Sequence, residues 1–129
     1  MRQHIGTPAG SPPATGYSHA VAFDGPVVVI SGQIPLDSEG KAVGPDAETQ
    51  TRQVFENVKA ALAGAGTDLD HAVKITYYLT DVADLAAVRA VRSEYLNQDQ
   101  PPASTLVVVS ALVDPSFKIE IEVMALLPS

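Results

Sequence analysis

Val73-Lys74-Ile75-Thr76-Tyr77-Tyr78-Leu79 is a strand-like run that lies between two segments of helical character. The segment before it, residues 46–63, has a potential N-cap at Asp46 and carries apolar side chains at helical spacing. The segment after it starts at Asp81, with Asp84 in its first turn. Helix and strand patterns that follow one another in this way predict an α+β fold with two helices.

Further strands are expected on the N-terminal side of this centre. Apolar and small side chains alternate over residues 17–23, and residues 27–30 read Val-Val-Val-Ile. Asp24-Gly25 lies between these two runs. Because Asp-Gly suits a tight turn with positive φ at both central residues, we expect a β-hairpin here.

The C-terminal side adds two strands. Gln100-Pro101-Pro102 ends anything helical, and strands are expected at residues 105–109 and 118–126. The predicted order is β-β-α-β-α-β-β, with the option of a short additional strand near residues 2–6. We expect one domain over residues 1–129, because this length suits a single hydrophobic core.

Composition excludes several classes of protein. No apolar run approaches the roughly 20 residues needed to span a membrane. The chain has no cysteine and no apolar stretch of signal-peptide type at its start, so we expect a cytoplasmic protein. Its net charge is −7, from 15 acidic and 8 scattered basic residues. This balance argues against a nucleic-acid partner, since such binding depends on neutralising phosphates.

Two of the predicted strands indicate self-association. Residues 27–30 and 106–109 are apolar at every position, whereas a strand with one solvent-exposed face should alternate. The two helices can cover only one face of the sheet, so we expect a second copy of the chain to cover the other. The alternative is that these strands are central in the sheet and partly covered by loops.

Several motifs together point to a known family. Gly16-Tyr17-Ser18-His19-Ala20-Val21 resembles the early Gly-Pro-Tyr-Ser-Gln-Ala motif of the YjgF/Rid family, also called L-PSP endoribonucleases. Ile30-Ser31-Gly32-Gln33-Ile34-Pro35 matches its Ser-Gly-Gln-Ile/Val-Pro turn. Residues 73–81 match its lysine-containing strand, and Pro102-Ala103 and residues 118–122 match its C-terminal signature. The resemblance covers nearly the whole chain in the same order.

The resemblance implies a chorismate-mutase-like α+β fold with a mixed sheet and two helices on one face. It also implies a homotrimer in which the sheets form a central barrel, with small-metabolite sites in the clefts between subunits. The best-understood members hydrolyse enamines and imines, such as tautomers of 2-aminoacrylate, to 2-keto acids and ammonia, without a metal or organic cofactor.

One position departs from that pattern. In the deaminating members an arginine follows Pro-Ala and binds the substrate carboxylate, whereas this chain has Ser104 there. A guanidinium gives two charge-assisted hydrogen bonds, each worth on the order of 1.5–3 kcal/mol, but a serine hydroxyl is one neutral donor. We therefore expect a different substrate, and a large loss of efficiency on an α-imino acid.

The resemblance makes Glu120 the candidate catalytic residue, as the carboxylate that positions the attacking water. Alternatively, Glu120 has no catalytic role and lies with Lys118 and Glu122 on an ordinary solvent-exposed strand face. The candidate ligand-binding residues are Tyr17, Ser31, Gly32, Arg89, Ser104 and Thr105.

Each ligand-binding candidate has its own reason. Tyr17 could present its hydroxyl to a ligand or simply pack. Ser31 and Gly32 could offer backbone N–H groups where glycine allows a close approach. Thr105 is the next donor beside Ser104. Arg89 could supply the positive charge lost at position 104, or face solvent one turn from Arg92.

Three functions remain open on the sequence. The first is an imine or enamine hydrolase of altered substrate. The second is a metabolite-binding trimer without catalysis. The third is an endoribonuclease or translation inhibitor, against which the acidic balance speaks. His4, His19 and His71 show no metal-ligand spacing, so no metal site is expected.

Overall fold

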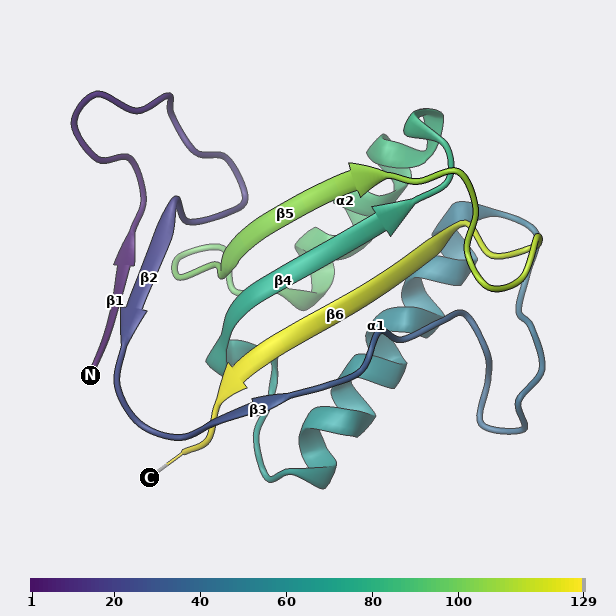
Figure 1. Cartoon of the computed structure of the whole chain (residues 1–129), viewed down its shortest axis with the longest axis horizontal. Helices are drawn as coiled ribbons and strands as arrows, with labels where there is room; N and C mark the ends of the chain where they lie inside the picture. Colours follow the sequence, from purple (N-terminus) through teal and green to yellow (C-terminus); the bar gives the residue numbers. More distant parts are fainter. Residues whose placement is uncertain (129) are drawn as a thin grey trace.

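The computed structural model describes residues 1–128 and contains two β-sheets and two α-helices (Figure 1). Short 3₁₀ turns at Leu69–His71 and Val82–Asp84 precede β4 and α2. The elements are β1 (Arg2–Ile5), β2 (Ala20–Phe23), β3 (Val27–Val29), α1 (Ala47–Gly64), β4 (Ala72–Leu79), α2 (Leu85–Tyr95), β5 (Ala103–Val108) and β6 (Ile119–Leu126). The predicted order and the optional first strand are confirmed.

The larger sheet has the strand order β3-β6-β4-β5. β4 and β5 are parallel, while β6 is antiparallel to β4 and β3, so the sheet is mixed. Both helices lie on one face of this sheet (Figure 1). The fold is therefore α+β with a mixed sheet and two helices on one face, as predicted.

The core lies between this sheet and the helices. Along β4 the side chains of Ile75, Tyr77 and Leu79 are buried under the helices, whereas the residues between them are half-buried on the other face. β6 alternates in the same way, with Ile121 in the core. We call the face away from the helices the open face; on the central strands β4 and β6 it carries mainly polar side chains.

The helix starts follow the predicted capping chemistry. The Asp46 carboxylate accepts a hydrogen bond from the Thr49 N–H at 2.9 Å and caps α1. The Asp81 carboxylate accepts from the Ala83 N–H at 2.9 Å, which starts a 3₁₀ turn, and α2 follows from Leu85. Among residues 1–128 no helix is long and apolar enough to cross a membrane.

The predicted hairpin around Asp24-Gly25 is wrong. β2 pairs with β1 in a separate two-stranded sheet, while β3 pairs with β6. Pro26 follows the turn and has no N–H for a hairpin ladder, and its carbonyl instead accepts from the Leu127 N–H at 3.0 Å. The Asp24 carboxylate is held by the amino group of Met1 at 2.6 Å. The segment is therefore a crossing between two sheets.

The two apolar strands are the outer strands of the larger sheet, so the alternative that they are central is wrong. Val28 packs against the core, but Val29 on β3 is 69% exposed. On β5, Val107 is 40% and Val108 51% exposed. Edge strands with exposed β-branched side chains and unpaired backbone groups are sites at which another chain can associate.

Candidate functional site

The candidate residues separate onto the two faces of the larger sheet. Ser104 is the neighbour of Ile75 in the β4–β5 ladder, so its side chain lies on the helix side. Glu120 is the neighbour of Tyr78 in the β4–β6 ladder, so its side chain lies on the open face. Two distinct clusters result, one around each of these residues.

A cavity of about 150 Å³ surrounds Ser104 at the edge of the sheet. Its walls come from β4, β5, α2 and the long loop between β1 and β2. The lining residues are Thr15, Tyr17, Tyr77, Arg89, Arg92, Ser104 and Leu106. The structure thus brings together three of the predicted ligand-binding residues: Tyr17, Arg89 and Ser104. We call this space the α2–β5 cavity.

Buried hydrogen bonds hold Tyr17 beside Ser104. The neighbouring Ser18 is buried, and its hydroxyl donates to the Pro101 carbonyl at 2.6 Å. Its backbone N–H donates to the Pro102 carbonyl at 3.1 Å, and Ser18 forms a parallel bridge with Ala103. The loop before β2 is therefore attached to the start of β5, and one wall of the cavity is fixed to the other.

Arg92 is the ligand-site candidate that sequence reasoning missed. It lines the α2–β5 cavity together with Arg89, three residues earlier on the same helix face. Gly16 has a φ of +77°, and an added Cβ there would overlap the Arg92 guanidinium. Glycine at position 16 suits this backbone conformation and leaves room for the guanidinium of Arg92. The sequence did carry a signal for Arg92, because a spacing of three residues places Arg89 and Arg92 on the same face of a helix.

Two buried polar atoms in the cavity wall have no hydrogen-bond partner within residues 1–128: Arg92 Nε and the Tyr77 hydroxyl. Burial raises the pKa of Tyr77 well above its ordinary value, and the charge of Arg92 opposes part of that rise. Tyr77 is therefore a neutral phenol at physiological pH. Unsatisfied buried donors are rare in proteins and leave this wall able to bind a polar ligand.

Glu120 is the centre of the second cluster. It is half-buried, and burial raises the pKa of its carboxyl, with a smaller contribution from the negative charge of Glu122. The Tyr78 hydroxyl donates to the Glu122 carboxylate at 2.7 Å, so Glu122 is engaged and Glu120 is the free carboxylate of the pair. A carboxylate with a raised pKa is a better proton acceptor near neutral pH.

Gly32 lies directly against Glu120, because an added Cβ at this position would collide with the carboxylate. The chain bulges away from β6 here, between the Ile30 N–H bond to Val123 (3.1 Å) and the Gln33 N–H bond to Ile121 (2.8 Å). Within residues 1–128, neither Ser31 nor Gly32 donates its backbone N–H to an acceptor. The second cluster therefore combines a carboxylate with two free amide donors, and we call it the Glu120 cluster.

Thr105 is not brought together with Ser104. As the ladder neighbour of Thr76 it lies on the open face, where its hydroxyl accepts a hydrogen bond from Lys74 Nζ at 2.6 Å. Adjacent strand residues point to opposite faces, so a single site cannot use both side chains of one copy from the same side.

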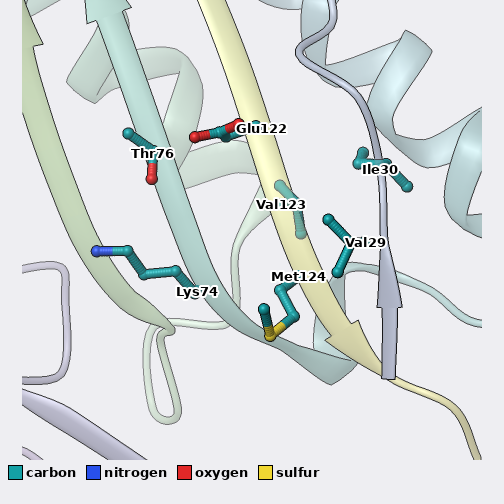
Figure 2. Close-up of a pocket in the computed structure, with 7 residues that line it drawn as sticks. All are labelled: Val29, Ile30, Lys74, Thr76, Glu122, Val123 and Met124. Atoms are coloured by element: carbon teal, nitrogen blue, oxygen red, sulfur yellow. The ribbon is translucent and has the colours of Figure 1, made fainter. Parts of the chain in front are cut away.

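The open face also holds a shallow hollow of about 180 Å³ (Figure 2). Apolar side chains from β3 and the end of β6 line one side of it, and polar side chains from β4 and β6 line the other (Figure 2). Its residues are Val29, Ile30, Lys74, Thr76, Glu122, Val123 and Met124. It contains neither Glu120 nor Ser104. In residues 1–128, no group of three His, Asp or Glu side chains is placed to hold a metal ion.

Comparisons with known proteins agree with this architecture. Residues 9–127 match the model of the family described as Endoribonuclease L-PSP. Protein DfrA of Myxococcus xanthus is 44% identical over 118 residues, which cover 89% of this chain and 88% of that protein. The 2-iminobutanoate/2-iminopropanoate deaminase of Salmonella typhimurium is 39% identical over 103 residues, which cover 78% and 80%. The crystal structure of YyfB from Yersinia pestis, a protein of unknown function of the conserved Rid family, has a TM-score of 0.86 at 34% identity and covers 98% of both chains.

Proposed function

The chain belongs to the YjgF/Rid family, whose model is described as Endoribonuclease L-PSP, and on this premise we propose that it hydrolyses small imines or enamines in a site completed by a second copy of the chain. The observation that carries the proposal is the Glu120 cluster, in which a carboxylate with a raised pKa lies beside free backbone amides. The similarity to a 2-iminobutanoate/2-iminopropanoate deaminase supports the reaction class.

The proposed reaction needs a base and a means of holding the substrate. The Glu120 carboxylate takes a proton from water as the water oxygen adds to the carbon of the C=N bond, and the protonated Glu120 passes this proton to the nitrogen, which gives a carbinolamine. Glu120 then takes the hydroxyl proton of the carbinolamine and gives it to the nitrogen, so that the C–N bond breaks, ammonia leaves and a C=O bond forms. An enamine reacts in the same way after it has tautomerised to the imine. The free N–H groups of Ser31 and Gly32 are suited to a polar substrate atom or the attacking water.

A second copy is part of the proposal because one chain keeps the two clusters apart. The α2–β5 cavity lies on the helix side of the outer strand β5, and Glu120 lies on the open face of β6. A neighbouring copy that packs its open face against this edge would bring its Glu120 to the cavity. We propose a homotrimer with the sheets as a central barrel, an arrangement that also covers the exposed Val29 and Val107.

The hydrolase is tested with 2-iminopropionate generated in situ, by measuring keto acid and ammonia release from wild type, Glu120→Ala and Ser104→Arg. We expect turnover by wild type, slower than by a deaminase with an arginine at the position of Ser104, and none by Glu120→Ala. Activity in Ser104→Arg alone would mean that the scaffold is intact but the natural substrate differs. No turnover by either protein, with 2-iminobutanoate also tried, would reject the hydrolase.

The trimer is tested by sedimentation equilibrium at micromolar concentration, where we expect three times the mass of one chain. A monomer at this concentration would remove the shared site.

A metabolite-binding trimer without catalysis is the second candidate. The observation that favours it is Ser104, which offers one neutral donor in the place where deaminating relatives are expected to carry arginine. It predicts a ligand-induced thermal shift without any chemistry.

RNA cleavage is the function named in the family description. Evidence for it would be RNA cleavage by a purified sample that Glu120→Ala eliminates. We also propose a cytoplasmic location, with which the lack of cysteine is compatible.

A further inference from the structure

We propose that Arg92, together with Arg89, binds the carboxylate of the substrate in the α2–β5 cavity, so that the substrate is a small imino or enamino acid held from helix α2 rather than from strand β5. This inference rests on the proposed function for the reaction, but the binding of the carboxylate stands on the cavity itself. It reverses the expectation that losing an arginine at position 104 removes the preference for a carboxylate.

The cavity is cationic in a chain whose net charge is −7. Two of its seven lining residues are arginines, and none is acidic. Within residues 1–128 neither Arg89 nor Arg92 has a carboxylate within ion-pair distance, whereas Arg52 on α1 is bound by Glu94 at 2.7 Å and Glu48 at 3.3 Å. The two charges of α2 are therefore available to a ligand.

Arg92 packs against the loop before β2, but its hydrogen-bonding capacity is not used. Its guanidinium lies against Gly16, and within residues 1–128 its buried Nε has no acceptor. A small rotation of the guanidinium into the cavity gives it an anionic partner. Guanidinium groups pair with carboxylates through two parallel hydrogen bonds, which favours a carboxylate over a neutral ligand of the same shape.

Ser104 contributes by being small. A long side chain here would fill the space in front of α2, but serine leaves the cavity of about 150 Å³ open. A protein cavity of roughly this volume holds a benzene-sized molecule. The ligand is therefore a compact acid of a few carbon atoms, with the Ser104 and Tyr17 hydroxyls as further polar contacts at the cavity wall.

The experiment measures binding of pyruvate, a 2-keto acid of the product type, by isothermal titration calorimetry. Pyruvamide is the neutral isostere. The variants are Arg92→Gln, Arg89→Gln and Lys41→Gln, and the last is the matched control because the Lys41 side chain pairs with Glu39 on an exposed loop away from the cavity. We expect Arg92→Gln to weaken pyruvate binding by at least about tenfold, Arg89→Gln by less, and Lys41→Gln not at all.

A further arm keeps the proposal testable. Pyruvamide should bind wild type at least about tenfold more weakly than pyruvate. If circular dichroism shows that Arg92→Gln does not fold, the proposal is tested by pyruvate binding to Arg89→Gln and by the difference in affinity between pyruvate and pyruvamide for wild type. Pyruvate affinity within twofold of wild type in the folded arginine variants, or equal binding of pyruvamide, would overturn the proposal.

The outcomes also separate this inference from the hydrolase. Arginine-dependent pyruvate binding with no imine turnover would reject the hydrolase and keep the carboxylate site. Imine turnover that does not depend on Arg89 or Arg92 would keep the hydrolase and reject the carboxylate site.

Discussion

The α2–β5 cavity and the Glu120 cluster lie on opposite faces of one sheet and differ in charge, in packing and in the chemistry they offer. The cavity has two arginines that form no ion pair with the acidic side chains of residues 1–128, and its walls are joined by the buried Ser18. The Glu120 cluster has a carboxylate with a raised pKa against the glycine of a bulge. We propose that one region binds an anion and that the other accepts a proton.

On the proposed function, neither region alone is a complete active site. A substrate carboxylate in the cavity of one copy is separated by the sheet from that copy's own Glu120. A base acts on water only within hydrogen-bond reach of the reacting atoms. The function therefore depends on which surfaces of two copies meet, and the exposed valines of the outer strands β3 and β5 are where that contact is expected.

The largest effect is expected for Glu120→Gln, which removes the base and keeps the shape of the side chain. Turnover of 2-iminopropionate should fall by about 10²- to 10⁴-fold, as is typical for the loss of a general base. Pyruvate binding should be retained, because the variant leaves both arginines of the α2–β5 cavity in place. Glu39→Gln, on an exposed loop, is the control. A loss of turnover of less than tenfold would show that Glu120 is not the base.

A mixing experiment tests whether the two regions act across copies. Ser104→Phe should inactivate by filling the α2–β5 cavity, and Glu120→Gln should inactivate by removing the base. If each site takes its cavity from one copy and its Glu120 from the next, trimers assembled at random from equal amounts of the two variants recover roughly one quarter of wild-type activity.

Activity is measured after the two variants are refolded together, with each variant refolded alone as control. Activity that stays at the level of the separate variants would place both regions of a working site in the same copy.

The smallest effect is expected for Glu122→Gln, which removes a negative charge beside Glu120 but leaves the Glu120 carboxylate in place. The negative charge of Glu122 helps to raise the pKa of Glu120, so its removal should lower that pKa. Glu120 acts as a base only when ionised, and activity is lost as pH falls through its pKa. The acid limb of the kcat/KM profile should therefore move to lower pH in the variant.

The glutamine oxygen can still accept the hydrogen bond from Tyr78, so the strand contact is kept. An acid limb that is unmoved, or that moves to higher pH, would mean that the limb reports a group other than Glu120.

The local elements were predictable because their signals are local. Asp46 caps α1 as its position before an apolar helical pattern suggested, and the alternation in residues 73–79 matches a half-covered central strand. The hairpin was not predictable, since Asp-Gly specifies only a turn. Whether β2 and β3 then pair with each other depends on β1 and β6, which compete for them from distant parts of the chain.

The candidate site, too, was predictable from the sequence only in part. The sequence alone was enough for the family and the α+β fold, and it supplied the candidate residues Glu120 and Ser104. Only the tertiary structure placed Ser104 with Arg92 and apart from Thr105, and put Glu120 on the opposite face. The physical reason is that strand pairing and the packing of a helix and a loop against an edge strand are set by contacts between distant residues, which no local pattern encodes.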